Sequence, residues 1–208
     1  MESHQRAIAI DPRYAGAYSN LGVAQSALGR ADEAIASFRQ ALALDPAYAT
    51  PHYNLGNALA RRGAFADAET EYLEALRRAP DMAMAHYYLG LSRLEQGRVR
   101  EAVESLDTAF RLNPTFADGY FEAGNALLGR NEPEIAERYY REALRVNPNR
   151  AEVHCNLGTV LVQRGQLREA EAAYRTALRL KPDYPLARQN LAMCLERVRA
   201  GESNQTKR

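Results

Sequence analysis

Histidine and cysteine are the residues of this chain whose chemistry could bind a metal or activate a nucleophile. The 208 residues include four histidines and two cysteines. Three of the histidines begin similar stretches, at His52 (HYNLG), His86 (HYYLG) and His154 (HCNLG). Neutral imidazole is a common zinc ligand, so this recurrence raises the question of a metal site. Cys155 and Cys194 lack the spacing typical of a metal or redox pair.

The positions of these histidines argue against metal binding. At a spacing of 34 residues, the same position is occupied elsewhere by Tyr18 and Tyr120. Interchange of histidine with tyrosine suits a half-buried side chain that fills space, not a ligand. Stacked helices are also about 8–10 Å apart, whereas a zinc–nitrogen bond is about 2 Å long. We therefore expect no metal and no other cofactor.

The chain lacks the common sequence signatures of catalysis. It contains no P-loop, no dinucleotide-binding glycine motif, no zinc-protease motif and no nucleophile elbow. Carboxylates recur at predicted helix starts, where the positive end of the helix dipole favours them. These carboxylates include Glu33, Asp67, Glu101 and Glu169. The sequence predicts that this chain is not an enzyme.

Composition and charge argue against several classes of partner. The formal net charge is +1, with 46% hydrophobic and 25% charged residues. This balance gives no strong field that would favour a nucleic acid. No apolar run approaches the roughly 20 residues that span a bilayer, and the first residues do not resemble a signal peptide. We expect a cytoplasmic protein with no nucleic-acid binding and no membrane insertion.

An internal repeat of 34 residues organises almost the whole chain. Prolines recur at this interval at Pro12, Pro46, Pro80, Pro114, Pro148 and Pro182. Glycines recur at Gly22, Gly56, Gly90, Gly124 and Gly158, and large residues at Phe38, Tyr72, Leu106, Tyr140 and Tyr174. Each unit predicts two amphipathic helices that are joined at a glycine and ended by the proline. Because one helix pair cannot bury its faces alone, consecutive pairs must stack.

The second unit, residues 49–82, shows why the sizes of these residues recur. Gly63 breaks the helical pattern and is expected at the turn. Gly56 and Ala68 are small because two helix backbones must pass closely there. Tyr72 is large because it fills the space beside those small residues.

The period, the order of the markers and the helix–turn–helix unit resemble the tetratricopeptide repeat. The resemblance implies an all-α, right-handed α-solenoid of stacked helix–turn–helix repeats. Five repeats fit the sequence, at 15–48, 49–82, 83–116, 117–150 and 151–184. Residues 1–14 match a second helix alone, residues 185–199 are expected to form a C-terminal capping helix, and residues 200–208 a disordered tail. Positions within a repeat are numbered 1 to 34, so that residue 15 occupies position 1.

The fourth repeat departs from this pattern at its turn. Asn131 replaces the usual glycine, and Pro133 follows it. Asparagine tolerates the left-handed conformation, and proline is acceptable in the first helical turn. We expect this repeat to fold, with a looser joint near residues 119–133.

In arrays of this kind the first helices line a concave groove, and helical spacing places positions 2, 5, 6, 9 and 13 on it. The residues expected to contact a bound peptide are Asn20, Tyr53, Asn54, Asn57, Tyr87, Tyr88, Leu91, Phe121, Glu122, Asn125, Asn156 and Asn190. Asparagine can pair with both the N–H and the C=O of a peptide backbone. Tyr88 and Glu122 interrupt the row of asparagines at position 6. The aromatic residues predict an apolar patch of the type that anchors interfaces, with packing against neighbouring repeats as the alternative.

The recurring NLG at Asn20, Asn54 and Asn156 is further similar to the arms of O-linked N-acetylglucosamine transferases. In those arms such asparagines hold peptide backbone. Position 2 carries no basic residue here, unlike arrays that clamp a C-terminal carboxylate. The resemblance implies a non-catalytic scaffold that binds a peptide segment or helix of a protein partner in its concave groove. The alternatives are a substrate-recognition arm of a larger enzyme such as a glycosyltransferase, and a self-assembling array, a homo-oligomer joined through the open N-terminal face.

Overall fold

The computed structural model is all-α throughout the backbone that it describes, residues 1–205, and it describes side chains up to residue 200. Within residues 1–205 it has twelve helices and no strand. The chain divides into two compact units, Met1–Asn113 and Pro114–Arg208, each with its own stack of helix pairs. The predicted all-α fold of stacked helix pairs is confirmed in each unit.

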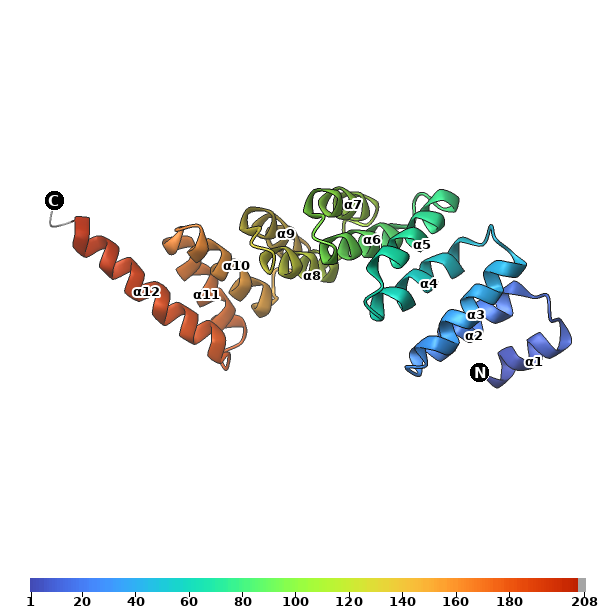
Figure 1. Ribbon diagram of the computed structural model, residues 1–208. Coiled ribbons are helices and arrows are strands. Elements are labelled where there is room, and N and C mark those ends of the chain that lie inside the picture. The colour runs from blue at the N-terminus through green and yellow to red at the C-terminus, as the bar shows by residue number, and fades with distance from the viewer. Residues whose placement is uncertain (206–208) are drawn as a thin grey trace. The chain divides into compact units, whose positions relative to one another are not determined.

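The first unit is built from three helix pairs and one preceding helix. Its helices are α1 (Glu2–Ile10), α2 (Ala15–Ala27), α3 (Ala31–Leu44), α4 (Ala49–Arg61), α5 (Phe65–Arg78), α6 (Ala83–Glu95) and α7 (Val99–Leu112). The pairs are α2 with α3, α4 with α5 and α6 with α7, and each pair packs on the next (Figure 1). The first helices α2, α4 and α6 also contact one another in sequence, so they form one layer.

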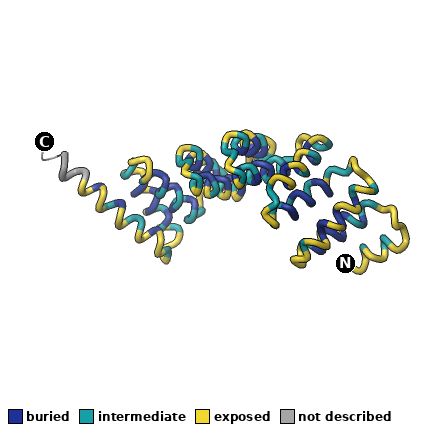
Figure 2. The backbone as a smooth tube through the Cα atoms, in the orientation of Figure 1, coloured by how far each residue is buried: buried dark blue, intermediate teal, exposed yellow. Residues whose placement is uncertain are grey.

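The second unit has two helix pairs and one long helix. Its helices are α8 (Ala117–Leu128), α9 (Pro133–Val146), α10 (Ala151–Gln163), α11 (Leu167–Leu180) and α12 (Pro185–Gln205). Helix α12 packs on α11 and α10, in the place of a further first helix. In both units the buried residues lie on the sides of the helices that face their partners (Figure 2).

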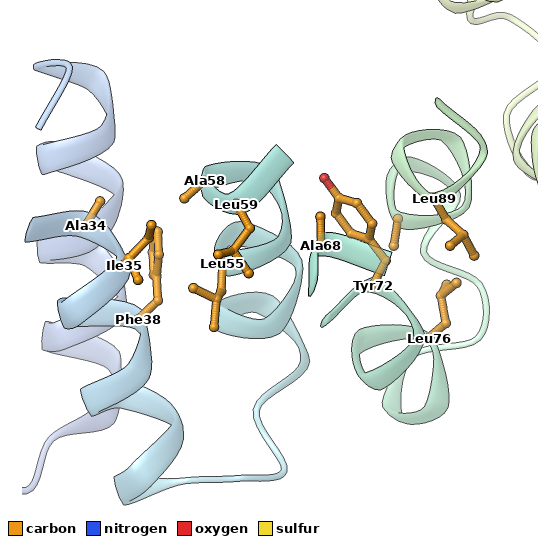
Figure 3. Close-up of a cluster of buried hydrophobic side chains, with 11 residues drawn as sticks. Ala34, Ile35, Phe38, Leu55, Ala58, Leu59, Ala68, Tyr72, Leu76 and Leu89 are labelled. Carbon is orange, nitrogen blue, oxygen red and sulfur yellow. The ribbon is translucent and has the colours of Figure 1, made fainter. Parts of the chain in front are cut away.

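A contact between a glycine and a large side chain closes each helix pair. A Cβ atom added to Gly56 would lie 2.6 Å from Cε1 of Tyr72, closer than real Cβ atoms approach a neighbour. An added Cβ atom would clash in the same way at four other glycines: Gly22 with Phe38, Gly90 with Leu106, Gly124 with Tyr140 and Gly158 with Tyr174. Tyr72 has an exposed fraction of 0% and belongs to a hydrophobic cluster that runs from α3 through α4 and α5 to α6 (Figure 3). The predicted size relation between these two positions is therefore confirmed.

The turn between the two helices of a repeat requires a left-handed backbone. Positive φ angles of 74°, 77°, 75° and 75° occur at Gly29, Gly63, Gly97 and Gly165. In the fourth repeat Asn131 adopts this conformation with φ of 60°, and Pro133 begins α9. The expectation that Asn131 can take the left-handed conformation of the usual glycine is confirmed. The looser joint near residues 119–133 stays a prediction.

A buried glutamate at position 21 connects neighbouring repeats. Glu69 accepts a hydrogen bond from Nε of Arg93 at 2.9 Å, from the following repeat. Glu137 accepts hydrogen bonds from Arg141 of its own helix and from Arg164 of the following repeat. Burial alone would raise the pKa of Glu137, but these hydrogen bonds outweigh burial and hold the pKa below its usual range.

The C-terminal helix is longer than the sequence predicted. We expected a helix over residues 185–199 and a disordered tail from residue 200. Instead α12 continues to Gln205, so the predicted tail is wrong for residues 200–205, and residues 206–208 lie outside the described part. The residues before Ala200 are strong helix formers, and a single glycine at Gly201 costs only about 1 kcal/mol. No proline follows to end the helix.

Candidate functional site

Three pockets lie at equivalent places between first helices of consecutive repeats. The largest, about 330 Å³, is called the Tyr88 pocket and is lined by Asn57, Ala60, Arg61, Phe65, Tyr72, Tyr88, Leu91, Ser92 and Glu95. The Phe38 pocket, about 250 Å³, is lined by Val23, Ser26, Ala27, Phe38, Asn54, Asn57, Ala58 and Arg61. The Thr159 pocket, about 190 Å³, is lined by Thr159, Val162, Gln163, Tyr174, Asn190, Met193, Cys194 and Arg197. All three use positions 9, 12, 13 and 24 of one repeat and positions 6, 9, 10 and 13 of the next.

In three repeats the residue at position 9 accepts a hydrogen bond from the tyrosine at position 24 of the same repeat. The hydroxyl of Tyr72 donates to Oδ1 of Asn57 at 2.8 Å, and the hydroxyl of Tyr140 donates to Oδ1 of Asn125 at 2.8 Å. Burial raises the pKa of both tyrosines, so both hydroxyls stay protonated and act as donors at neutral pH. These hydrogen bonds hold the side chain at position 9 in one orientation.

The asparagines at position 6 behave in two different ways. Asn156 donates from Nδ2 to Oδ1 of Asn125 at 2.7 Å, and Asn190 donates to Oγ1 of Thr159 at 3.4 Å. Both therefore use part of their donor capacity to link consecutive first helices. Asn54 has no such link, because the residue at position 9 of the preceding repeat is Val23, which carries no acceptor.

Three tyrosines gather at the Tyr88 pocket. The ring centroids of Tyr53 and Tyr88 are 6.0 Å apart, and those of Tyr72 and Tyr88 are 6.4 Å apart with nearly parallel planes. Tyr53 and Tyr88 are half-buried, as is Leu91 beside them. Burial raises the pKa of Tyr53, and a hydrogen bond with Asn57 partly offsets that effect. The structure thus brings together the predicted aromatic residues of the first unit, with one exception.

That exception is Tyr87, which we predicted to line the groove. Its exposed fraction is 1%, so it cannot contact a bound peptide. Its ring lies 6.2 Å from the ring of Phe110 on α7 and 5.2 Å from that of Tyr88. The prediction is wrong because position 5 of this repeat faces the second helix of its own pair. Cys155, at the same position in the fifth repeat, is also buried.

The predicted residues of the second unit make a different surface. Phe121 is half-buried, and the guanidinium of Arg150 lies 4.8 Å from the centre of its ring. Arg150 also pairs with Asp118 at 2.5 Å. Glu122 and Asn125 are exposed on the same helix, as is Asn20 on α2 in the first unit. Since Arg150 covers its ring, Phe121 offers less free apolar area than the tyrosines of the first unit.

Arg61 is the cation of the groove in the first unit. It lines both the Tyr88 pocket and the Phe38 pocket. Its side chain is exposed, and it has no ion-pair partner among residues 1–200. The neighbouring Arg62, by contrast, pairs with Asp32 at 2.6 Å. Glu95 lies on the α6 side of the Tyr88 pocket.

The recurring histidines hold the connection between repeats. Nε2 of His86 donates to the carbonyl of Pro80 at 2.9 Å, and Nε2 of His154 donates to the carbonyl of Pro148 at 2.9 Å. His52 lies 3.4 Å from the carbonyl of Pro46 in the same way. These contacts satisfy a carbonyl beyond the end of the preceding helix. Across the described side chains, no three metal-binding groups come together.

The two cysteines are free and fully buried, with exposed fractions of 0% for Cys155 and 1% for Cys194. Burial raises the pKa of both thiols. The thiol of Cys194 donates to the carbonyl of Leu167 at 3.3 Å. Both side chains therefore belong to the packing of the repeats.

The comparisons with known proteins agree with this repeat geometry. Models of the tetratricopeptide repeat match residues 53–115, 121–185 and 155–200, with further matches at 26–63 and 5–36. The chain belongs to the tetratricopeptide repeat family. A search of curated proteins gives no match to this sequence.

Several solved tetratricopeptide repeat structures have the same fold. YrrB, described as a TPR protein with an unusual peptide-binding site, is 23% identical with a TM-score of 0.73, covering 89% of this chain and 96% of its own. MamA from Desulfovibrio magneticus RS-1 is 23% identical with a TM-score of 0.72, covering 82% and 97%. A thermophilic TPR protein from Thermus thermophilus is 25% identical with a TM-score of 0.58, covering 87% and 98%.

Some groove residues of this tetratricopeptide repeat protein were missing from the sequence prediction. The large residues at position 24, such as Tyr72, form pocket floors although they were assigned only to the core. Phe65 and Ser92 also line the Tyr88 pocket. The large residues at position 24 recur visibly in the sequence, but their place in a pocket depends on the first helix of the next repeat, and no recurrence marks Phe65 or Ser92. In the part described, no helix is both long and apolar enough to cross a membrane.

Proposed function

We propose that this chain is a non-catalytic protein-interaction module that holds an extended peptide segment of a partner protein across the first helices of its first unit. The observation that carries this proposal is the pair of adjacent pockets over Phe38 and Tyr72, which share Asn57 and Arg61. A concave, mostly apolar site with a few fixed polar groups suits a bound chain.

The polar groups of this groove match the needs of a peptide backbone. Asn54 has a half-buried amide with no hydrogen-bond partner among the described side chains. It can donate to a peptide carbonyl and accept from a peptide N–H at the same time. Asn57 is held in place by Tyr72, which reduces the side-chain entropy lost on binding.

The apolar groups supply an anchor for a side chain of the partner. Tyr88 and Leu91 are half-buried on α6, next to Phe65 from α5. Rigid tyrosine rings give large contact areas at low entropic cost and are enriched at the energetic centres of interfaces. The peptide-binding site that is described for YrrB supports the same use of a similar fold.

A substrate-recognition arm of a glycosyltransferase stays an alternative. In such arms the asparagines at position 6 would form a continuous track. Here Asn156 and Asn190 donate to the preceding repeat, and Tyr88 occupies position 6 in the third repeat. This arrangement favours a short site in the first unit over a track along the whole chain.

Selection of peptides on the intact chain tests the proposal. The probe is a displayed library of random peptides about ten residues long, which reach roughly 33 Å when extended. We expect enriched peptides whose binding is lost with Tyr88→Ala and weakened with Asn54→Ala. Leu73→Ala is the control, because Leu73 is 45% exposed on α5 and lines none of the three pockets. Enrichment of no peptide, or binding that Tyr88→Ala leaves unchanged, would refute the proposed function.

A further inference from the structure

We infer that Arg61 selects a peptide with one acidic residue between two apolar anchors, a preference that rests on the function proposed above. The anchors occupy the Phe38 pocket and the Tyr88 pocket. The acidic side chain pairs with the guanidinium of Arg61 between them. The ligand class is thus an extended segment with the pattern apolar–acidic–x–apolar or apolar–x–acidic–apolar.

The two pockets provide two separate apolar contacts. The Phe38 pocket is bounded by Val23 and Ala27 of α2 on one side and by Ala58 of α4 on the other. The Tyr88 pocket is bounded by Ala60 of α4 on one side and by Leu91 of α6 on the other. Each floor is a large buried ring, so both pockets accept an apolar side chain.

The spacing of the helices sets the spacing of the anchors. The two pockets share α4 as a wall, so they are one helix apart in the layer of first helices. Neighbouring helices lie about 8–10 Å apart. A peptide in the extended polyproline II conformation advances about 3.1 Å per residue with three residues per turn, so two anchors separated by three residues point to the same side and fit the two pockets.

The charges of the groove place the acidic residue between the anchors. Arg61 projects from the shared helix α4 and lines both pockets. It has no carboxylate partner in residues 1–200, and an arginine can bind a carboxylate with two parallel hydrogen bonds. The attraction of this shared cation therefore places the acidic side chain between the two anchors.

A charge-reversal experiment tests this inference. The same displayed library of random peptides is selected in parallel on the wild-type chain and on Arg61→Glu. We expect acidic residues between the anchors on the wild type, and lysine or arginine at that place on the variant. For one enriched acidic peptide, Arg61→Ala should weaken binding about twofold to fivefold, the range for a partly exposed ion pair. Arg39→Glu on α3 is the control, because Arg39 is exposed and lines none of the three pockets, and it should keep the acidic preference.

The outcomes separate this inference from the proposed function. Peptides that depend on Tyr88 but show no charge preference, or the same preference on Arg61→Glu, would overturn the role of Arg61 and leave the function standing. Enrichment of no peptide on any variant would overturn both. Far-UV circular dichroism of each variant shows whether it is folded, so that a lost preference is not mistaken for unfolding. Arg61→Ala supplies a second, neutral variant, which should prefer neither acidic nor basic residues between the anchors.

Discussion

Replacement of Gly56 by alanine tests the packing that builds the groove. The new Cβ would lie 2.6 Å from Cε1 and 2.8 Å from Cδ1 of Tyr72, so the ring must move. Tyr72 is fully buried, and it donates to Asn57 and stacks on Tyr88. A shift of this ring therefore disturbs the pocket as well as the core.

The expected loss of stability is the sum of one favourable and two unfavourable contributions. Alanine in place of glycine favours the helix by about 1 kcal/mol. Overpacking of a dense core costs about 1–3 kcal/mol, and loss of the hydrogen bond from Tyr72 to Asn57 costs about 1 kcal/mol more. The net effect is a decrease of about 1–3 kcal/mol in the free energy of unfolding.

Urea denaturation followed by circular dichroism measures this difference. Gly129→Ala is the matched control, because Gly129 has φ of −62° and a Cβ there would meet its nearest atoms at 3.5 and 3.6 Å. We expect Gly129→Ala to be neutral or stabilising by about 0.5–1 kcal/mol. If Gly56→Ala and Gly129→Ala change the free energy of unfolding equally, the reasoning from the Tyr72 contact is refuted.

Three further predictions concern other parts of the fold. Asn131→Val should lower the free energy of unfolding by about 1–2 kcal/mol, because a β-branched residue is strained at φ of 60°, whereas Asn131→Gly should not; denaturation of both variants decides this. The pKa of Glu137 is below its usual range in the folded chain, so its stabilising contribution is present above a pH of about 4.3 and is lost as pH falls through the folded pKa. Urea midpoints from pH 7 to pH 3 should therefore fall more for the wild type than for Glu137→Gln, and parallel curves would show that the pair with Arg164 contributes nothing. Cys155 and Cys194 should react slowly with a thiol reagent in the folded chain and completely in urea, since both are buried and their pKa values are raised; rapid labelling of the folded chain would contradict this burial.

The repeat register could be predicted because local rules fix it. The glycine at Gly63, its replacement by Asn131 and the pairing of Gly56 with Tyr72 all depend on neighbours within one repeat. The chemical identity of each residue was enough to predict its place in the fold.

The burial and the hydrogen bonding of each groove residue could not be predicted in the same way. Tyr53 and Tyr87 occupy the same repeat position, yet the first is half-buried and the second is fully buried. Tyr87 packs on Phe110 of its own second helix, a contact that depends on side-chain sizes in both helices. Whether Asn156 or Asn54 is available to a ligand depends on a residue in the preceding repeat, which no single motif contains.

The acceptor at position 9 has an evolutionary consequence. Asn125 and Thr159 each engage the asparagine that follows on the next first helix, whereas Val23 leaves Asn54 without a partner. A single substitution at position 9 can therefore release or sequester the amide of an unchanged neighbour. The groups that are available to a ligand are therefore determined at the junctions between repeats. New binding sites can arise by drift at one junction while every other junction keeps its ligand-facing groups.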